Sequence, residues 1–448
     1  MPVGRRYWAE LAWLGDGEPG LRRDVLIELD GERFAAVTPG VTDPGPDVVR
    51  LRGLTIPGLA NAHSHAFHRA LRGRTHIGRG TFWTWRERMY ELAGRLEPDT
   101  YHALARAAYA EMALAGVTCV GEFHYLHHAP NGVPYADMNA MGHALLAAAD
   151  EAGIRITLLD TLYLTATVDG GPPEGPQRRF SDEDVDGWSV RHSSLSDAPY
   201  ARIGAALHSV RAVPAEAIAT FAERTAGVPL HLHLSEQRAE NEACLAYHDR
   251  TPTQLLADAG VLGPGTTAVH ATHVTDSDRA LLGDSATRVC LCPTTERDLG
   301  DGIGPARALA DAGSPLCLGS DSHAVVDLFE EARAVELHER LRAEQRGHFS
   351  AEDLLTAATA GGHAALGWPD AGRIAPGARA DLVTVRLDTV RTAGADPAQA
   401  LAAVVFAATA ADVSHVVRDG RVIVRDGVHC AIPDVSTALA QAIAAVTG

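Results

Sequence analysis

The sequence predicts an α/β protein: a (β/α)₈ barrel of the TIM type that carries a small β-sandwich domain formed from both chain termini. Three observations predict it. Eight short apolar segments recur along the chain, each followed by an Ala-rich helical stretch or a long loop. Two β-hairpin patterns stand at opposite ends of the chain. The 448 residues also exceed the roughly 100–200 residues of an average domain, which leaves room for a barrel with an attachment.

Each end of the chain carries the pattern of a β-hairpin. Asp-Gly stands between short apolar runs at both places, and this dipeptide favours the tight turn of a hairpin. The runs and their turns are 25–29 and 33–37 around Asp30-Gly31, and 414–418 and 421–425 around Asp419-Gly420. We expect the two ends to share one β-domain, with an N-terminal part over residues 1–55 and a C-terminal part, including a terminal helix, over residues 369–448.

The catalytic barrel is expected over residues 56–368. Its strand candidates are 54–60, 117–123, 154–160, 202–207, 228–234, 266–271, 288–292 and 315–320. The helical candidates in the gaps are 98–115, 138–152, 215–226, 253–259, 276–282, 305–312 and 326–345. Residues 163–200 are rich in Gly, Pro, Asp and Arg, so we interpret them as a long loop insertion. Eight strands with helices between them favour a closed barrel over an open sheet.

Composition excludes several classes of protein. The formal net charge of −18 argues against a nucleic acid or an anionic membrane as partner, because both require a basic face. No apolar run approaches the roughly 18–20 residues of a membrane span, and acidic residues interrupt the N-terminal segment, so we expect a cytoplasmic protein without a signal peptide. Six scattered cysteines fit reduced thiols. The 22 histidines stand out, because imidazole is the commonest metal ligand.

Polar side chains come at or just past the ends of four predicted strands, where barrels build their active sites. After the first strand, His63 and His65 are two residues apart, so both rings point to the same side of an extended chain. His270 ends the sixth strand and Asp321 follows the eighth. Taken alone, these residues also have ordinary explanations: surface histidines, a packed core histidine and a helix cap.

The segment after the fifth strand reads HLHLSE. His231 and His233 share one face of the strand, and Glu236 lies three residues beyond His233, where the strand turns into a loop. Spacing alone does not decide which histidine is a ligand. We interpret His231 as a packed residue of the barrel interior.

Together, these residues predict a site for one divalent ion with an open position for water. The expected ligands are His63, His65, His233 and Asp321. Zn²⁺ is the preferred ion, and Fe²⁺ tolerates the same ligands. A bound Zn²⁺ lowers the pKa of a coordinated water to about 7. Glu236 and His270 then remain for proton transfer and for polarising the electrophile.

The motifs resemble the amidohydrolase superfamily. HSH after the first strand, HxxE after the fifth, His after the sixth and SD after the eighth match its pattern, and GRIAPGARADLV over 372–383 resembles the usual return into its β-domain. The resemblance covers nearly the whole chain and implies a metal-dependent hydrolase. No lysine follows the fourth strand, where His208 stands instead. A bridging carboxylated lysine is therefore not expected, and the site should hold one metal ion, as in the deaminase branch.

Further stretches resemble the formimidoylglutamate deiminase subfamily, which acts in histidine degradation. They are HSHAFHRAL (63–71) with FWTWRERMY (82–90), GEFHYLHH (121–128) and LHSVRAV (207–213). The subfamily hydrolyses N-formimino-L-glutamate, a small dianion, to N-formyl-L-glutamate and ammonia. Two carboxylates call for bidentate cations, and the resemblance selects Arg86 and Arg211 for this role. Tyr125 and His208 could donate further hydrogen bonds.

Several of these residues keep a second interpretation. Arg86 could be a structural cation stacked on Trp83 or Trp85, and Arg211 could form a salt bridge at a helix start. Where the subfamily usually has Gln, this chain has His68. That change removes an amide contact to the substrate or replaces it with an imidazole.

Two other groups of residues also suggest metal binding. They are the histidines at 124, 127 and 128, and the CxC of Cys290 and Cys292. We interpret the histidines as supporting or surface groups. The cysteines fall in a predicted core strand, and three histidines with one aspartate already complete a site.

The resemblance implies a mechanism. Asp321 takes a proton from the metal-activated water, His270 steadies the tetrahedral intermediate at the formimino carbon, and Glu236 delivers a proton so that ammonia leaves. One alternative is another aminohydrolase of the same branch, acting on guanine, a pterin or S-adenosylhomocysteine; paired arginines favour the dianion over such bases. A second alternative is a catalytically silent barrel that serves as a binding module, which the complete ligand set disfavours. The family also implies a homodimer.

Overall fold

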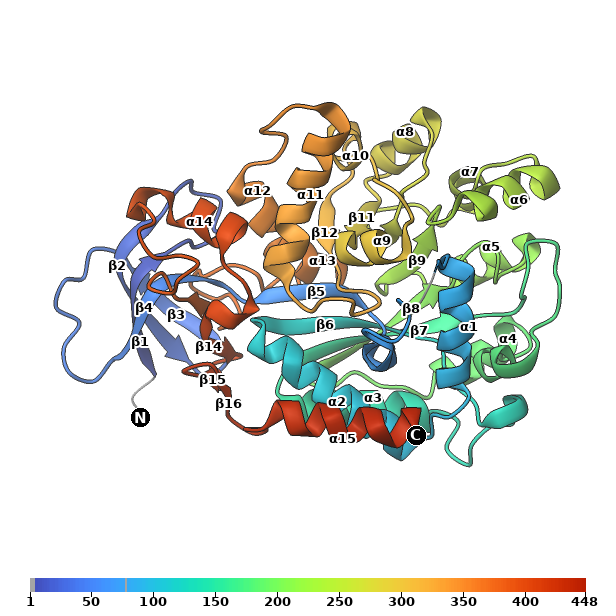
Figure 1. The fold of residues 1–448 in the computed structure, drawn as a ribbon, viewed down its shortest axis with the longest axis horizontal. Helices are drawn as coiled ribbons and strands as arrows, with labels where there is room; N and C mark the ends of the chain where they lie inside the picture. The colour runs from blue at the N-terminus through green and yellow to red at the C-terminus, as the bar shows by residue number, and fades with distance from the viewer. Residues whose placement is uncertain (1–4, 77–78) are drawn as a thin grey trace.

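The structure is a computed structural model that describes residues 5–76 and 79–448. Two sheets organise it, as Figure 1 shows. One is a parallel sheet of eight strands that forms a barrel. The other is a separate eight-stranded sheet made from both ends of the chain, and it lies to one side of the barrel. The predicted combination of a (β/α)₈ barrel and a β-domain from the two termini is therefore confirmed.

The barrel strands follow one another in chain order, and each neighbouring pair is parallel. They are β5 (Leu59–Ser64), β6 (Val117–His124), β7 (Arg155–Leu162), β8 (Ala201–Leu207), β9 (Leu230–Leu234), β10 (Thr266–His270), β11 (Arg288–Leu291) and β12 (Leu316–Leu318). A bridge between Ser64 and Asp321 joins the first strand to the segment after the last and closes the barrel at its carboxyl end. This closure brings residues from opposite ends of the barrel sequence to one rim.

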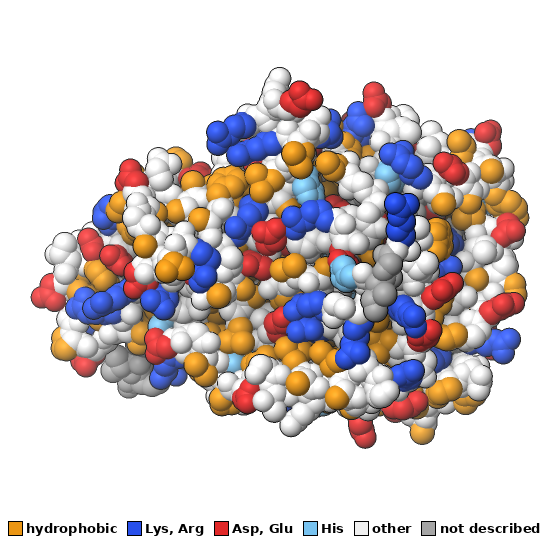
Figure 2. All heavy atoms as spheres, in the orientation of Figure 1, with side chains coloured by type: hydrophobic (Ala, Val, Ile, Leu, Met, Phe, Trp, Pro, Cys, Tyr) orange, Lys and Arg blue, Asp and Glu red, His pale blue; other side chains and the backbone are white. Residues whose placement is uncertain are grey.

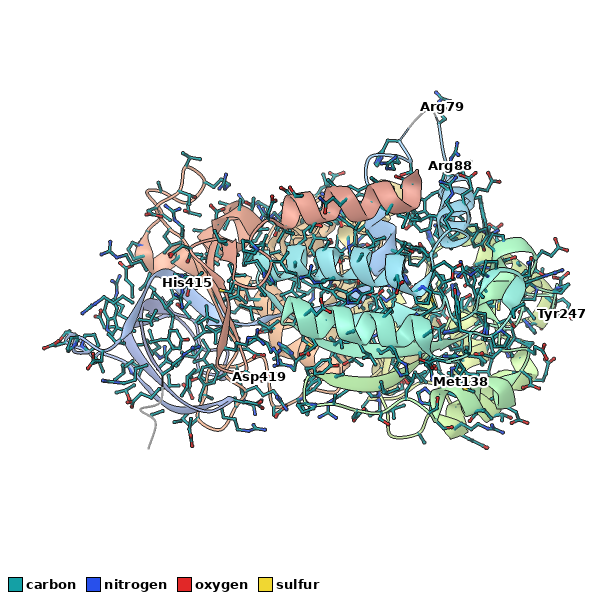
Figure 3. All side chains as sticks on the ribbon, turned by 90° about the horizontal axis from the view of Figure 1, so that it is seen from below. Arg79, Arg88, Met138, Tyr247, His415 and Asp419 are labelled. Atoms are coloured by element: carbon teal, nitrogen blue, oxygen red, sulfur yellow. The ribbon has the colours of Figure 1, made fainter. Side chains whose placement is uncertain are left out.

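Helices surround the barrel strands. The longer ones are α1 (Phe82–Ala93), α2 (Pro98–Leu114), α3 (Ala140–Ala152), α4 (Val185–His192), α5 (Ala215–Arg224), α6 (Arg238–His248), α7 (Pro252–Asp258), α8 (Asp276–Asp284), α9 (Pro293–Leu299), α10 (Ala306–Ala312) and α11 (Leu328–Ala343). Shorter turns are α12 (Ala351–Thr356), α13 (Gly362–Ala365), η1 (Ala66–Leu71), η2 (Pro130–Gly132), η3 (Gly175–Phe180) and the π-turn η4 (Ala357–Gly361). The terminal helix α15 (Val435–Thr447) packs along α2, which packs on α3; Figure 3 shows the three side by side.

The terminal sheet has the strand order β16-β15-β14-β13-β4-β1-β2-β3, with β1 and β4 parallel. Its strands are β1 (Arg6–Ala12), β2 (Arg22–Asp30), β3 (Arg33–Thr38), β4 (Val49–Pro57), β13 (Leu382–Val385), β14 (Val413–Arg418), β15 (Arg421–Arg425) and β16 (Val428–His429). Helix α14 (Ala400–Ala407) and the turns η5 (Pro397–Gln399) and η6 (Ala410–Asp412) connect β13 to β14. Both predicted Asp-Gly turns join neighbouring strands. A bridge joins Arg33, at the start of β3, to Arg379, just before β13. Residues next to both positions share one apolar core, in a sandwich-like arrangement.

The predicted first barrel strand, 54–60, is wrong in its position. Residues up to Pro57 belong to β4 in the terminal sheet, and β5 of the barrel begins at Leu59. Gly58 lies between them in a crowded junction, where a Cβ would stand 2.4 Å from Thr118 Oγ1 and 2.8 Å from Asp381 Cβ. The end of β4, from Leu54 to Pro57, is buried like β5, so the apolar run continues across the junction and hydrophobicity marks no boundary there.

The insertion at 163–200 is not simply a loop, because it contains η3 and α4. The buried side chain of Arg179 ties it to the rest of the molecule by donating to the carbonyls of His128 and Leu96, each at 2.7 Å. Helices α1, α4, α6, α9 and α12 lie outside the predicted helical segments. Their apolar faces are short, so sequence periodicity carries little signal for them.

Charged side chains of both signs cover the face of the molecule that Figure 2 presents. Figure 2 shows acidic and basic side chains intermixed over the face it presents, instead of one continuous basic surface. Among the residues that the structure describes, no helix combines the length and apolar character needed to span a membrane.

Candidate metal centre and active site

Four side chains meet at the carboxyl rim of the barrel, and we call them the rim cluster: His63, His65, His233 and Asp321. One ligand atom from each lies within 4.8 Å of all the others. The Nε2 atoms of His63 and His65 each stand 3.3 Å from Asp321 Oδ1, and the Nε2 atoms of His63 and His233 are 3.2 Å apart. The structure thus brings together all four predicted ligands, from the ends of β5 and β9 and the segment after β12.

Hydrogen bonds at the outer ring nitrogens orient two of these imidazoles. His65 Nδ1 lies 3.0 Å from the carbonyl oxygen of Phe123, and His233 Nδ1 lies 2.9 Å from that of His208. A carbonyl can only accept, so both Nδ1 atoms donate and both Nε2 lone pairs face the cluster. Burial lowers the pKa of His63, His65 and His233 well below its usual value, which keeps the rings neutral. Neutral imidazoles and one carboxylate in this geometry fit a single divalent cation.

A buried carboxylate holds the HSH segment in place. Glu122 on β6 accepts hydrogen bonds from Ser64 Oγ at 2.8 Å and from the backbone N–H of Ala66 at 2.7 Å. Ser64 Oγ also lies 2.9 Å from His323 Nε2, two residues past Asp321. These bonds connect the first and second barrel strands to the segment after the last strand. The role of Glu122 is not recognisable from the sequence, since a single glutamate in an apolar strand carries no motif.

Two titratable groups stand beside the rim cluster. His270 Nε2 lies 3.7 Å from Asp321 Oδ2 and 3.9 Å from Glu236 Oε1. Burial alone would lower the pKa of His270, but the facing carboxylates of Glu236, Glu296 and Asp321 raise it to about 10. Burial raises the pKa of Glu236 to about 7. Both groups can therefore hold a proton near neutral pH, next to the site where a cation would bind.

A pocket of about 630 Å³ opens onto this arrangement. It contains all five side chains that the sequence analysis assigned to substrate binding: His68, Arg86, Tyr125, His208 and Arg211. Other side chains on its wall are Trp85, Tyr90, Tyr163, Phe180, Glu236, Glu240 and His270. Charged groups and neutral donors thus surround a space next to the rim cluster.

The two arginines each keep a buried donor without a hydrogen-bond partner among the described residues, at Nη1. The Arg86 guanidinium lies over the Trp83 ring, 4.4 Å from its centroid, and Arg211 Nε lies 3.3 Å from Glu240 Oε2. The stacking and salt-bridge interpretations therefore both describe real contacts. Neither contact uses Nη1, so each arginine retains a donor for a group in the pocket.

Neutral polar groups complete the pocket wall. Tyr125 Oη lies 3.0 Å from His68 Nε2, so the imidazole that replaces the usual Gln is joined to the tyrosine. The His208 ring packs 4.8 Å from Tyr163 and 5.4 Å from Tyr125, measured between ring centroids. Phe180 from the insertion packs on Tyr125 at 5.0 Å. The insertion therefore forms part of the pocket wall.

Other predicted or overlooked residues have clear positions. His231 donates toward the carbonyl of Ala365 at 3.0 Å inside the barrel, as a packed residue does. The histidines at 124, 127 and 128 are buried, which excludes the surface interpretation. Glu240 was overlooked, although its place one helical turn after Glu236 is a signal that the sequence contains.

Known proteins are similar to this chain in sequence and in fold. The model of the amidohydrolase family matches residues 54–423. The chain is 37% identical to formimidoylglutamate deiminase of Pseudomonas aeruginosa, over 94% of this chain and 95% of that one. It is 32% identical to 5-methylthioadenosine/S-adenosylhomocysteine deaminase of Halobacterium salinarum, over 90% and 88% of the two chains. Among solved structures, an amidohydrolase from Brucella melitensis superposes with a TM-score of 0.91 at 31% identity, over 99% and 100% of the chains.

Proposed function

The chain belongs to the amidohydrolase family and is a hydrolase of C–N bonds, and on this basis we propose that it hydrolyses N-formimino-L-glutamate to N-formyl-L-glutamate and ammonia. The observation that carries the substrate is the pair of partly buried arginines in the pocket beside the rim cluster, each with a buried Nη1 that has no partner among the described residues. A neutral purine would leave those donors unpaired, at a cost of roughly 1–3 kcal/mol each. The 37% identical relative supports the same substrate.

The pocket residues would bind and orient the dianion. Arg86 and Arg211 anchor the two carboxylates, and Tyr125, His208 and His68 donate further hydrogen bonds. Anchoring at both carboxylates leaves the formimino end facing the rim cluster. Such orientation contributes about 7–11 kcal/mol in the most favourable intramolecular cases.

The remaining residues move protons. The rim cluster would hold one divalent ion, Zn²⁺ or Fe²⁺, which when bound lowers the pKa of water and so provides a nucleophile at neutral pH. Asp321 accepts the proton of that water on Oδ2, because Oδ1 faces the histidines. His270 Nε2, 3.7 Å from Oδ2, steadies the tetrahedral centre formed when the water oxygen bonds to the formimino carbon. Glu236 protonates the imino nitrogen, and Asp321 then gives the same nitrogen the proton that it took from water. The C–N bond breaks as the hydroxyl proton of the tetrahedral centre returns to Glu236, so ammonia leaves and the oxygen remains in the formyl group.

An ammonia-release assay tests the proposal. The panel is N-formimino-L-glutamate, N-formimino-L-aspartate, guanine and S-adenosylhomocysteine, each given to the zinc-loaded wild-type protein and to Arg211→Met. We expect the first compound to be the best wild-type substrate. In Arg211→Met its KM should rise by about a hundredfold with zinc content unchanged, because truncating one partner of a buried charge pair costs about 2–5 kcal/mol.

Arg88→Met is the matched control, since Arg88 is an exposed arginine on the same helix as Arg86 and forms a surface pair with Glu91. It should leave KM unchanged. Ammonia from guanine or S-adenosylhomocysteine, and not from the formimino compounds, would favour the purine deaminase alternative. An unchanged KM in Arg211→Met would remove Arg211 from substrate binding.

A further inference from the structure

Glu296 contacts His270 on the side away from the rim cluster. It is a buried residue of α9, and its Oε1 lies 3.4 Å from His270 Nδ1. The same oxygen accepts the backbone N–H of Cys292 at 3.0 Å. The mechanism described above uses His270 but assigns nothing to this carboxylate.

The backbone does not by itself orient the His270 ring. His270 is the last residue of β10, and its φ of 73° and the φ of 52° at Ala271 place both residues in the left-handed region. Strand alternation no longer sets the direction of a side chain at such a bend, and a non-glycine residue there needs support from its surroundings. Its two ring nitrogens have different surroundings: Nε2 faces Asp321 and Glu236, and Nδ1 faces Glu296.

We propose that Glu296 is a positioning residue: its carboxylate accepts the Nδ1–H of His270 and thereby holds Nε2 toward the reacting carbon. An ionised carboxylate can only accept, so Nδ1 must carry the proton in this contact. The hydrogen bond at one ring nitrogen then decides what the other nitrogen presents to its site. This inference rests on the proposed function in so far as His270 acts on the substrate.

A purely structural role is the competing explanation, since Glu296 also caps the start of α9 through Cys292. Two substitutions separate the roles. Glu296→Gln keeps an acceptor, because the Cys292 N–H selects the amide oxygen for the position of Oε1, where it also faces His270 Nδ1. Glu296→Leu removes the acceptor at similar volume. We expect Glu296→Leu to lower kcat by about 10–100-fold with KM nearly unchanged, and Glu296→Gln to stay within about fivefold of wild type.

A double-mutant cycle with His270→Asn tests whether the effect passes through His270. In that background Glu296→Leu should lower kcat by less than about twofold, because the partner that it positions is already gone. Glu331→Gln is the matched control. Glu331 is a buried carboxylate of α11 that accepts the Thr294 N–H of α9 at 2.9 Å, so its loss should act equally in both backgrounds.

A spectroscopic measurement makes the inference independent of the substrate. In proton NMR spectra of the zinc-loaded protein, the Nδ1–H of His270 should give a downfield resonance that disappears in His270→Asn. It should persist in Glu296→Gln and be lost in Glu296→Leu. A resonance that persists in Glu296→Leu, or a kcat loss of equal size in the His270→Asn background, would overturn the proposal. If no panel compound releases ammonia but the resonance behaves as expected, only the proposed function fails.

Discussion

Among the described residues of this barrel, three groups of side chains have the geometry to hold a metal ion, and one of them, His270, Cys292 and Asp321, shares its carboxylate with the rim cluster. The two groups that have no residue in common differ in what surrounds their carboxylate. One is the rim cluster. The other, which we call the insertion cluster, consists of His124, His127 and Asp160, and its ligand atoms also lie within 4.8 Å of one another. Arg191 from the insertion reaches Asp160 Oδ1 with Nη1 at 2.5 Å. In the described part of the chain, the basic groups within 4 Å of the Asp321 carboxylate are imidazoles alone.

The difference shows that ligand geometry alone does not identify a metal site. Arg191 also donates from Nε and Nη2 to Asp182, at 2.9 and 2.8 Å, so every nitrogen of its guanidinium is paired. Burial alone would raise the pKa of Asp160 and Asp182. Arg191 holds the pKa of Asp160 well below its usual range, and hydrogen bonds from His128 and Arg191 do the same for Asp182. The insertion cluster therefore already contains its cation. The rim cluster has converging lone pairs and a carboxylate, and needs a cation from solution.

The largest expected effect separates the two clusters by metal content. His233→Ala should reduce bound zinc from one ion per chain to nearly none and lower turnover by about a thousandfold or more, because the water then keeps a pKa near 15.7 instead of about 7. His127→Ala, the matched change in the insertion cluster, should retain the ion. Zinc content can be measured by atomic emission after gel filtration, and turnover by ammonia release.

Either of two results would contradict the assignment of the metal ion to the rim cluster. Retention of a full equivalent of zinc in His233→Ala would show that the rim cluster is not the metal site. Loss of zinc in His127→Ala, with the fold intact by circular dichroism, would assign the ion to the insertion cluster.

The next effect is on stability and belongs to the insertion cluster. Arg191→Met leaves two buried carboxylates without their cation, which should cost about 3–5 kcal/mol in the free energy of unfolding. Arg224→Met is the control. Arg224 makes an exposed pair with Asp186, which lies on the same helix as Arg191, so this substitution should cost about 1 kcal/mol or less in the free energy of unfolding. Urea midpoints at a fixed zinc concentration measure both. Equal shifts in the two variants would contradict a structural role for the buried pair.

Much of the rim could be predicted from the sequence because a parallel barrel converts chain order into position. The carboxyl ends of its strands meet at one rim, so HSH after the first strand and Asp321 after the last were expected to be neighbours. His231 and His233 illustrate the limit of spacing. Both lie on one face of β9, and only the structure shows that His231 bonds to a backbone carbonyl while His233 joins the cluster.

Other features carry no local signal. The sequence does not indicate the boundary between β4 and β5 at Gly58, since the end of β4 and the start of β5 are both buried and apolar. Glu296 contacts His270 from a different element, and Arg191 contacts Asp160 from the insertion. The two residues of each pair are far apart along the chain, so no sequence motif indicates that they meet. A buried charge is recognisable in the sequence only when its partner is predictable, and tertiary packing decides these partners.

The smallest expected effect is on the pH dependence of stability, and it tests further whether Arg191 is the cation of the insertion cluster. In the wild type, Arg191 holds the folded-state pKa of Asp160 below the unfolded value of about 3.9, so the stabilising contribution of this carboxylate is present above pH 4 and is lost as the pH falls through the folded pKa. In Arg191→Met, burial instead raises the pKa of Asp160, and protonation of this carboxylate removes part of the destabilisation as the pH falls. The stability gap between the two proteins should therefore narrow by about 1–2 kcal/mol between pH 7 and pH 4. Protonation of the rim cluster is common to both proteins, so it cancels in the difference between their free energies of unfolding. If urea titrations show that this difference stays constant from pH 7 to pH 4, Arg191 does not neutralise this carboxylate.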